Sequence, residues 1–402
     1  MKKLLASTAL VGASLFLPEV ANAATGLVTD VSAIDGVNFD APLKTAPATP
    51  DEQGRFDTRW RVAVPNIAPD ASEPVLRIQP LGVSKQQPEP DARQISLQID
   101  NDSWGVKELR DRYYTSGISA GIQTDGTQTD FVSRTAVKLL QPVARIVPQL
   151  EEGYRTYGLT AQHNIYTPER VGRRARLDDR PYAGVAVVHG AVADAGEHYA
   201  RAVQVSAGVV GPWAQAQEIQ TVFHAAVNRG DKPVGWGDQL RNEAFLNLSY
   251  VAANRLLEGT VAGFDYELSQ NHGATIGTAN INAHVGLMGK LGLGLSNILA
   301  PQMNDPMLPE LNSGRVPNDN GVELFGGATV QAVGRNVTLD GNLLQESHKV
   351  EKENLVTQAF AGVSMTHQRW SLSYTYNIKS HEFKTQSAGW QHYAGVRLAY
   401  RY

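Results

Sequence analysis

Alternating apolar and polar residues dominate the chain from Gln94 to Tyr402. Twelve segments of about ten residues place apolar or small side chains at every second position, with polar side chains between them. Irregular or turn-forming stretches separate the segments, and this period of two is typical of half-buried strands. The predicted strands cover residues 94–101, 115–124, 154–166, 181–193, 199–211, 245–257, 261–277, 279–292, 321–334, 355–367, 369–380 and 393–402.

One segment departs from the alternation. Residues 211–230 read GPWAQAQEIQTVFHAAVNRG, and Ile219, Val222 and Phe223 have the three- and four-residue spacing of a helix face. Glycines at both ends give start and stop signals. We therefore predict one short helix inserted between two strands, on the extracellular side or in the mouth of the strand region.

The first residues predict export. Lys2 and Lys3 precede a short apolar stretch, and Ala21-Asn22-Ala23 forms a small-residue cleavage site, so we assign residues 1–23 to a secretory signal peptide. The apolar stretch is too short to span a membrane. Residues 24–93 contain nine of the twenty prolines and are expected to be a largely irregular N-terminal segment before the strand region 94–402.

The exported strand region allows two architectures. The strands of a soluble β-sandwich show the same alternation of apolar and polar residues as the strands of a membrane barrel. Beyond the signal no run of 18 apolar residues exists, whereas an even number of strands and a final strand ending on Tyr402 are typical of outer-membrane barrels. The mean hydropathy of −0.27 agrees with a polar interior. We predict an all-β protein, a twelve-stranded antiparallel transmembrane β-barrel in the cell outer membrane.

The amino-acid composition excludes several classes of function. The chain has no cysteine, which excludes disulfides, thiolate nucleophiles and zinc–thiolate sites. A net charge of −4 shows no basic excess of the kind that nucleic-acid binding needs.

Three polar clusters lie near predicted strand ends. The first contains Asn101, Asp102 and Thr115, and the second contains Arg173 and Arg174. The third surrounds the inserted helix and contains His224, Asp231, Trp236, Gln239 and Glu243. Taken singly, each has a purely structural explanation, because Asn-Asp pairs cap turns and surface arginines contact solvent or lipid phosphates.

Together, the clusters supply the groups that ester hydrolysis requires. The Asp102 carboxylate is a hard oxygen ligand suited to Ca²⁺. His224 can accept a proton from water near neutral pH, and Arg173 and Arg174 offer fixed positive charge. The sequence GISAG around Ser119 matches a hydrolase nucleophile motif, but no helix follows Ser119 and it lies within a predicted strand, so we interpret this match as chance.

The motifs resemble one known family, the outer-membrane lipid A 3′-O-deacylases. The shared sequences are NDS after the first strand, DRYYTSGI at the second, IYTP…RR…DDRPYAG, and QTVFH…GDKPVGWGDQLRNE, in matching order from Gln94 onward. The resemblance implies a twelve-stranded barrel that binds Ca²⁺ and removes the 3′-linked acyloxyacyl chain of lipid A. It therefore implies a carboxylic ester hydrolase whose partners are lipopolysaccharide and outer-membrane lipids.

The resemblance also implies site residues. The family's catalytic histidine falls on His224, its Asn-Asp pair on Asn101 and Asp102, and its threonine on Thr115. The basic pair falls on Arg173 and Arg174, and an acidic residue after the histidine falls near Asp231, which with Asp102 is an expected metal ligand. Some members carry lysine where this chain has Arg173.

Two other functions stay open at this point. One is an outer-membrane phospholipase with a serine nucleophile, for which Ser119 is the natural candidate. The other is a catalytically silent structural barrel or porin, which would conduct ions and show no dependence on calcium.

Overall fold

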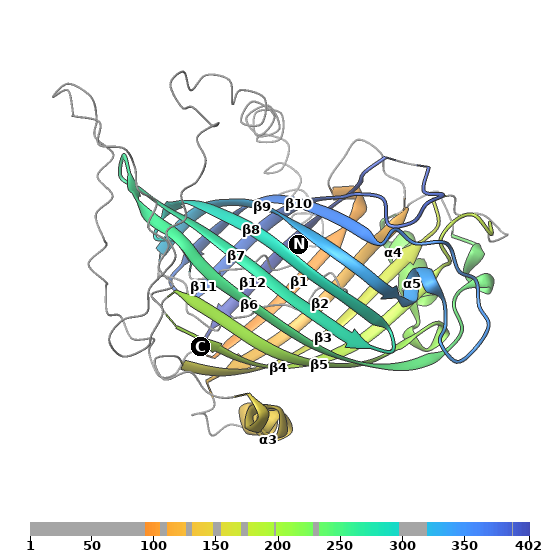
Figure 1. Ribbon diagram of the computed structural model, residues 1–402, viewed down its shortest axis with the longest axis horizontal. Coiled ribbons are helices and arrows are strands. Elements are labelled where there is room, and N and C mark those ends of the chain that lie inside the picture. Colours follow the sequence, from red (N-terminus) through yellow and green to blue (C-terminus); the bar gives the residue numbers. More distant parts are fainter. Residues whose placement is uncertain are drawn as a thin grey trace, which may run out of the picture. The chain divides into compact units, whose positions relative to one another are not determined.

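The computed structural model describes residues 93–104, 111–125, 131–147, 154–169, 176–196, 198–227, 233–296, 320–387 and 389–402. In this part of the chain, twelve antiparallel strands form one closed barrel (Figure 1). Each strand pairs with its neighbours in sequence, and β1 closes the barrel against β12. The predicted fold class, strand number and order are confirmed.

The strands agree closely with the segments predicted from alternation. Their bounds are β1 Gln94–Asn101, β2 Tyr113–Thr124, β3 Tyr154–Thr167, β4 Ala183–Ala195, β5 Tyr199–Val210, β6 Glu243–Val261, β7 Phe264–Gly277, β8 Asn280–Leu293, β9 Asn320–Asn336, β10 Leu355–His367, β11 Trp370–Lys379 and β12 Gln391–Arg401.

Successive side chains point to opposite faces of the barrel wall, as the pleat of a strand requires. In β8, Asn282 and His284 are buried in the lumen, whereas Ile281, Val285 and Leu287 are exposed on the outer face. A continuous hydrogen-bonded wall leaves no unpaired strand edge, and its apolar outer face suits the hydrocarbon of a bilayer.

The two ends of the barrel differ in their connections. At the end where β1 stops, five of the six connections are long, at 102–112, 168–182, 211–242, 337–354 and 380–390, and the sixth is the tight turn 278–279. We call this the loop end. At the opposite end, which we call the turn end, three of the five connections are tight turns, at 196–198, 262–263 and 368–369. The other two, 125–153 and 294–319, are longer, and the first contains α3 (Phe131–Ile146).

Three helices interrupt the strands in the described residues: α3 (Phe131–Ile146), α4 (Ala216–Val227) and the single turn α5 (Val337–Asp340). Figure 1 shows α4 and α5 at the same end of the barrel, and α3 outside the wall. The predicted inserted helix is confirmed as α4. It begins at Ala216 rather than Gly211, because residues 212–214 form a 3₁₀ turn and Gln215 has a left-handed backbone with φ 55°.

The expectation of a single inserted helix was wrong, because α3 is a second helix of similar length at the turn end. No apolar run marks α3, and Pro142 lies inside it. Among the described residues, none of the helices is long and apolar enough to cross a membrane. The predicted signal peptide, 1–23, and all of the Pro-rich segment except Arg93 lie outside the described residues.

Helix α4 packs against the outer face of the wall, not in the lumen. Gly184 of β4 has the parity of the outward-facing Val188, and a Cβ added to it would lie 2.5 Å from the Ala216 Cβ atom. Ile165 of β3 lies in one buried cluster with Ala216 and Trp236. The absence of a side chain at Gly184 therefore allows the helix to approach the wall.

A substitution on the lumen side tests the packing of β2. A Cβ at Gly117 would collide with the Tyr114 hydroxyl, which donates to Asp100 Oδ2 at 3.2 Å and accepts from Asn164 Nδ2 at 3.1 Å. We expect Gly117→Ala to lower the free energy of unfolding by about 1–3 kcal/mol. Urea titration of the folded barrel, followed by tryptophan fluorescence, measures the change.

The matched control is Gly237→Ala, because a Cβ at Gly237 would meet no atom within 4 Å. Equal stability of both variants would contradict the proposed packing of Tyr114.

Candidate active site

The candidate site begins where β1 ends. The Asn101 side-chain oxygen accepts hydrogen bonds from the backbone N–H and the hydroxyl of Ser103, and so caps the 3₁₀ turn Asp102–Trp104. Asp102 Oδ2 accepts from the backbone N–H of Arg112 at 2.9 Å. Asn101 therefore fixes the turn, and the returning chain holds the Asp102 carboxylate.

Strand β2 starts irregularly beside this turn. Tyr113 has φ 63°, a conformation that costs energy for a residue with a side chain, and the pairing of β2 with β3 shifts register at Thr115. Bulges of this kind re-aim side chains and are frequent beside active sites. The Thr115 hydroxyl lies 2.8 Å from the hydroxyl of Thr167 at the end of β3.

Strand parity places these residues on the outer face. Asn101 follows the outward-facing Leu97 and Ile99 at even spacing, and Thr167 has the same parity as Ile165, which α4 covers. Asn101 and Thr115 are nevertheless only 4% and 3% exposed. The candidate site therefore lies at the loop end on the outer face, on the wall that α4 flanks.

His224 is held by a buried carboxylate that the sequence analysis did not single out. His224 Nε2 lies 2.7 Å from Asp111 Oδ2, and both side chains are buried. The same Asp111 oxygen accepts from Gln220 Nε2 at 2.7 Å, and Gln220 Oε1 accepts from Trp236 Nε1 at 2.9 Å. Gln220 precedes His224 by one helical turn, so α4 presents both groups to Asp111.

The donor and acceptor groups in this series of hydrogen bonds determine where the hydrogens lie. An indole N–H is a donor only, so Gln220 must present its oxygen to Trp236 and its NH₂ to Asp111. An ionised carboxylate only accepts hydrogen bonds, so the 2.7 Å contact between Asp111 Oδ2 and His224 Nε2 requires a hydrogen on Nε2. In neutral His224 the lone pair is then on Nδ1. The arrangement defines a histidine base oriented by a carboxylate.

Two consecutive residues, Asp111 and Arg112, connect the histidine on α4 to the turn that contains Asp102. Asp111 binds His224 through its side chain, and Arg112 binds Asp102 through its backbone N–H. The β1–β2 connection thus brings the histidine and the Asp102 carboxylate together, although 122 positions separate them in the sequence.

Not all predicted residues belong to this arrangement. Arg173, Arg174 and Asp231 lie outside the described residues. Glu243 accepts from the backbone N–H groups of Leu343 and Leu344, which gives it a structural role in the β9–β10 connection. Trp236 supports the site through Gln220.

Sequence reasoning missed Asp111 and Gln220. Asp111 lies in the charged stretch between the first two strands, and its partner is more than a hundred residues away. The available signal was its place in DRYYTSGI, the motif that also contains Thr115. Gln220 could have been found as the residue one helical turn before His224.

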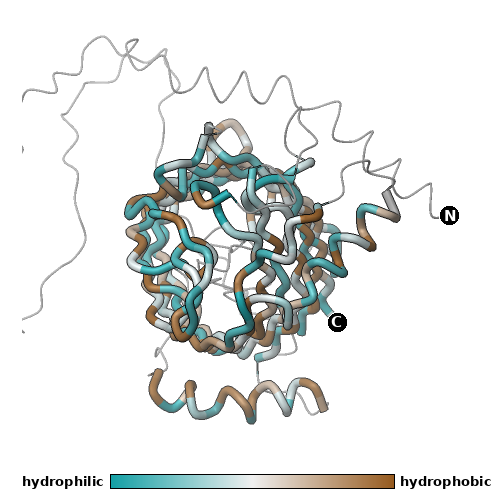
Figure 2. The backbone as a smooth tube through the Cα atoms, turned by 90° about the vertical axis from the view of Figure 1, so that its right-hand side faces the viewer, coloured by the Kyte–Doolittle hydropathy of each residue, from teal (hydrophilic) through white to brown (hydrophobic). Residues whose placement is uncertain are grey.

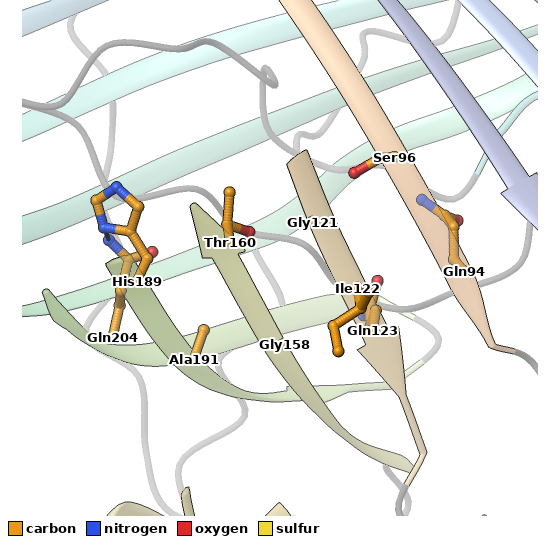
Figure 3. A pocket seen from close by; sticks show the side chains of 10 residues that line it. All are labelled: Gln94, Ser96, Gly121, Ile122, Gln123, Gly158, Thr160, His189, Ala191 and Gln204. Carbon is orange, nitrogen blue, oxygen red and sulfur yellow. Dashed lines mark hydrogen bonds between the residues drawn. The ribbon is translucent and has the colours of Figure 1, made fainter. Parts of the chain in front are cut away.

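Ser119 and the lumen cavities lie apart from the site. Ser119 is buried inside β2 and faces the lumen, opposite to the exposed Ile118. Figure 3 shows a cavity between the first strands, lined by lumen residues such as Gln123, His189 and Gln204. Neither it nor a second described cavity beside Asn247 contains a residue of the candidate site. A helix, α3, does follow β2, contrary to the expectation, but Ser119 lies inside the strand and not at a turn before the helix. The interpretation of GISAG as a chance match is consistent with this geometry.

On the lumen side of the loop end, Arg180 ties three connections together. Its buried guanidinium donates to Glu382 Oε2 at 3.1 Å and Thr338 Oγ1 at 2.8 Å, and lies 4.5 Å from the centre of the Tyr166 ring. Burial opposes ionisation of Glu382, but Lys379 and Arg180 outweigh it and hold the pKa of this carboxyl below its ordinary value. Beside it, burial raises the pKa of Asp179, which caps the loop by accepting from two backbone N–H groups.

The donor set at the end of β1 fits a hard cation. Asp102 offers carboxylate oxygen, and Thr115 and the turn carbonyls offer neutral oxygen ligands, as Ca²⁺ prefers. Within the described ranges, no group of three or more histidine, aspartate or glutamate side chains could hold a metal. A cation here would therefore need Asp102 together with neutral oxygens or with residues beyond those ranges.

Fold and site together define a transmembrane β-barrel with a polar site on its outer face. The family described as outer membrane protein LpxR matches residues 73–402. The chain therefore belongs to this family, which confirms the resemblance found in the motifs, and it is an outer-membrane protein. Outer-membrane barrels have mostly short periplasmic turns and longer extracellular loops. We therefore assign the loop end, where five of the six connections have eleven or more residues, to the extracellular side.

One solved structure supports the fold. LpxR from Salmonella typhimurium superimposes with a TM-score of 0.60 at 17% identity, over 77% of this chain and 100% of that chain. The β domain of the Bordetella autotransporter BrkA gives a TM-score of 0.39 at 10% identity, over 78% and 100%. No curated protein sequence matches the chain.

The contribution of the Arg180 cluster to the free energy of unfolding should depend on pH. Because the pKa of Glu382 is lowered in the folded protein, its contribution to stability is present above the unfolded pKa near 4.5 and is lost as pH falls through the folded value. We expect Glu382→Gln to lower the free energy of unfolding by about 3 kcal/mol at pH 7. The difference from wild type should shrink in urea titrations below pH 4.5.

The control is Glu351→Gln, which removes an exposed ion pair with Lys384 between two of the same connections. Exposed pairs contribute little, so this variant should match wild type at both pH values. A Glu382→Gln difference that does not change with pH would show that the charge of Glu382 is not responsible.

Proposed function

We propose that the protein is a calcium-dependent ester hydrolase that removes the 3′-linked acyloxyacyl chain from lipid A. The observation that carries the proposal is the buried His224–Asp111 pair on the outer face of the barrel, beside the Asp102 turn. The family match and the outer-membrane location support a lipid substrate from the same membrane.

His224 is the proposed general base. Its Nε2–H is engaged by Asp111, so Nδ1 takes the proton from the attacking water. As His224 becomes positively charged, the adjacent Asp111 carboxylate stabilises that charge. Asp111 and Gln220 act through His224 and are positioning residues.

The proposed cation site uses the Asp102 carboxylate, and Asp231 is its other predicted ligand. Bound Ca²⁺ would supply positive charge that polarises the ester carbonyl. Thr115 and Asn101 line the same face and would orient the ester, while Arg173 and Arg174 would pair with the phosphates of lipid A or with the developing oxyanion.

The position of the site suits a substrate that stays in the bilayer. On α4, Ile219, Val222 and Phe223 are exposed, next to the apolar outer wall. Acyl chains can therefore lie along α4 and the barrel while the ester reaches the polar groups at the rim. A serine phospholipase has no comparable support, because Ser119 faces the lumen.

A conservative change at Asp111 tests the histidine base. Asp111→Asn keeps the shape but removes the negative charge that stabilises protonated His224, so we expect kcat to fall by about 10²–10⁴ with little change in KM. Asp111→Glu should restore part of the rate. Asp265→Asn, at the turn end, is the control, and an unchanged kcat in Asp111→Asn would refute the assigned role.

The activity itself is tested on cells. Mass spectrometry of lipid A from cells expressing wild-type protein should show loss of one acyloxyacyl unit. His224→Ala and Asp102→Ala should abolish the loss, and a calcium chelator should prevent it in wild type. His272→Ala, an exposed histidine of β7, serves as the control.

Unchanged lipid A in cells containing folded wild-type barrel would refute the deacylase assignment, and phospholipids would then be the next substrate to assay. Activity that survives chelation would refute the calcium dependence alone.

A further inference from the structure

Helix α3 lies outside the barrel wall at the turn end (Figures 1 and 2). Leu140 and Ala144 are buried with Val192 of β4, and a Cβ at Gly190 would lie 2.6 Å from Leu140 Cδ2. One side of the helix is therefore fixed to the outer face of β3 and β4.

An outward-facing ion pair anchors the end of this helix. Arg155 of β3 binds Asp194 at 2.7 Å and donates to the carbonyl oxygens of Ala144 and Val147 at 3.1 and 2.8 Å. Asp194 is fully buried although its parity is that of the outer wall. The C-terminal end of α3 thus covers charged groups at the edge of the apolar wall and has a defined place beside the membrane.

The rest of the helix surface divides into two stripes. At 100° per residue, Val132, Leu139 and Ile146 lie within about 40° of one another, and all three are exposed. Arg134, Lys138 and Arg145 form a second exposed stripe, also within about 40°. The helix contains no acidic residue.

We propose that α3 binds the periplasmic leaflet of the outer membrane, with anionic phospholipids as its partner. The turn end faces the periplasm, and the apolar stripe continues the lipid-facing surface of the barrel at its edge. Val132, Leu139 and Ile146 enter the leaflet, and the three cations bind phosphate headgroups, as interfacial amphipathic helices do.

The absence of cysteine allows a direct test on the full chain. Single variants Leu139→Cys, Ile146→Cys and, as the matched control on the polar side, Gln141→Cys carry a nitroxide label in the folded barrel. The proteins are reconstituted into bilayers of phosphatidylcholine with or without phosphatidylglycerol. Spin-label collisions with oxygen and with a water-soluble nickel complex report whether each label lies in lipid or in water.

We expect the labels at positions 139 and 146 to collide several-fold more with oxygen relative to nickel than the label at position 141. Phosphatidylglycerol should increase this ratio, and the added changes Arg134→Gln, Lys138→Gln and Arg145→Gln should remove the increase. Heat-modifiable mobility on gels confirms that each labelled barrel is folded.

Three results would overturn the proposal. A label at position 139 that meets nickel as readily as the label at position 141 would show that the stripe stays in water. A ratio unaffected by phosphatidylglycerol would exclude anionic lipid as the partner. Labels that are immobile and shielded from both reagents would show that another protein, or a second copy, covers the stripe.

Discussion

Closure of the hydrogen-bonded wall is the constraint on which the rest of this structure depends. A bilayer offers no partner for an unpaired N–H or C=O group, so β1 must pair with β12 and each strand must keep its register. Side-chain direction then follows from parity alone. Polar groups can face the lumen freely, but polar groups on the outer face need cover, and both α3 and α4 provide it on β3 and β4.

The strands could be predicted because every strand of a barrel alternates lumen-facing and outward-facing side chains. The predicted and observed strand bounds differ where the backbone departs from regular strand geometry. Strand β2 begins two residues earlier than predicted, through the left-handed Tyr113 and the bulge at Thr115. Strand β7 begins at Phe264 rather than 261, because Ala262 and Gly263 adopt the positive φ values of a tight turn.

The candidate site was only partly predictable. Motifs identified His224, Asn101, Asp102 and Thr115, and the structure brings them to one rim. The pairing of His224 with Asp111 depends on how a helix from the β5–β6 connection folds back onto the wall, which no local pattern encodes. Helix α3 was not predicted from the sequence, and its place depends on β4 as well as β3, because Arg155 binds Asp194 and Leu140 packs with Val192.

A site on the outer face also changes the energetics of substrate access. An acyl chain lifted out of the membrane would expose each CH₂ group at roughly 0.8 kcal/mol, so a chain of about twelve carbons would cost about 10 kcal/mol. In the proposed reaction, a lipid that diffuses sideways to α4 would keep its chains in hydrocarbon and present only its ester at the rim. The outer wall of the barrel would then be the surface that lipids reach by diffusion within the membrane. No substrate would need to pass through the lumen.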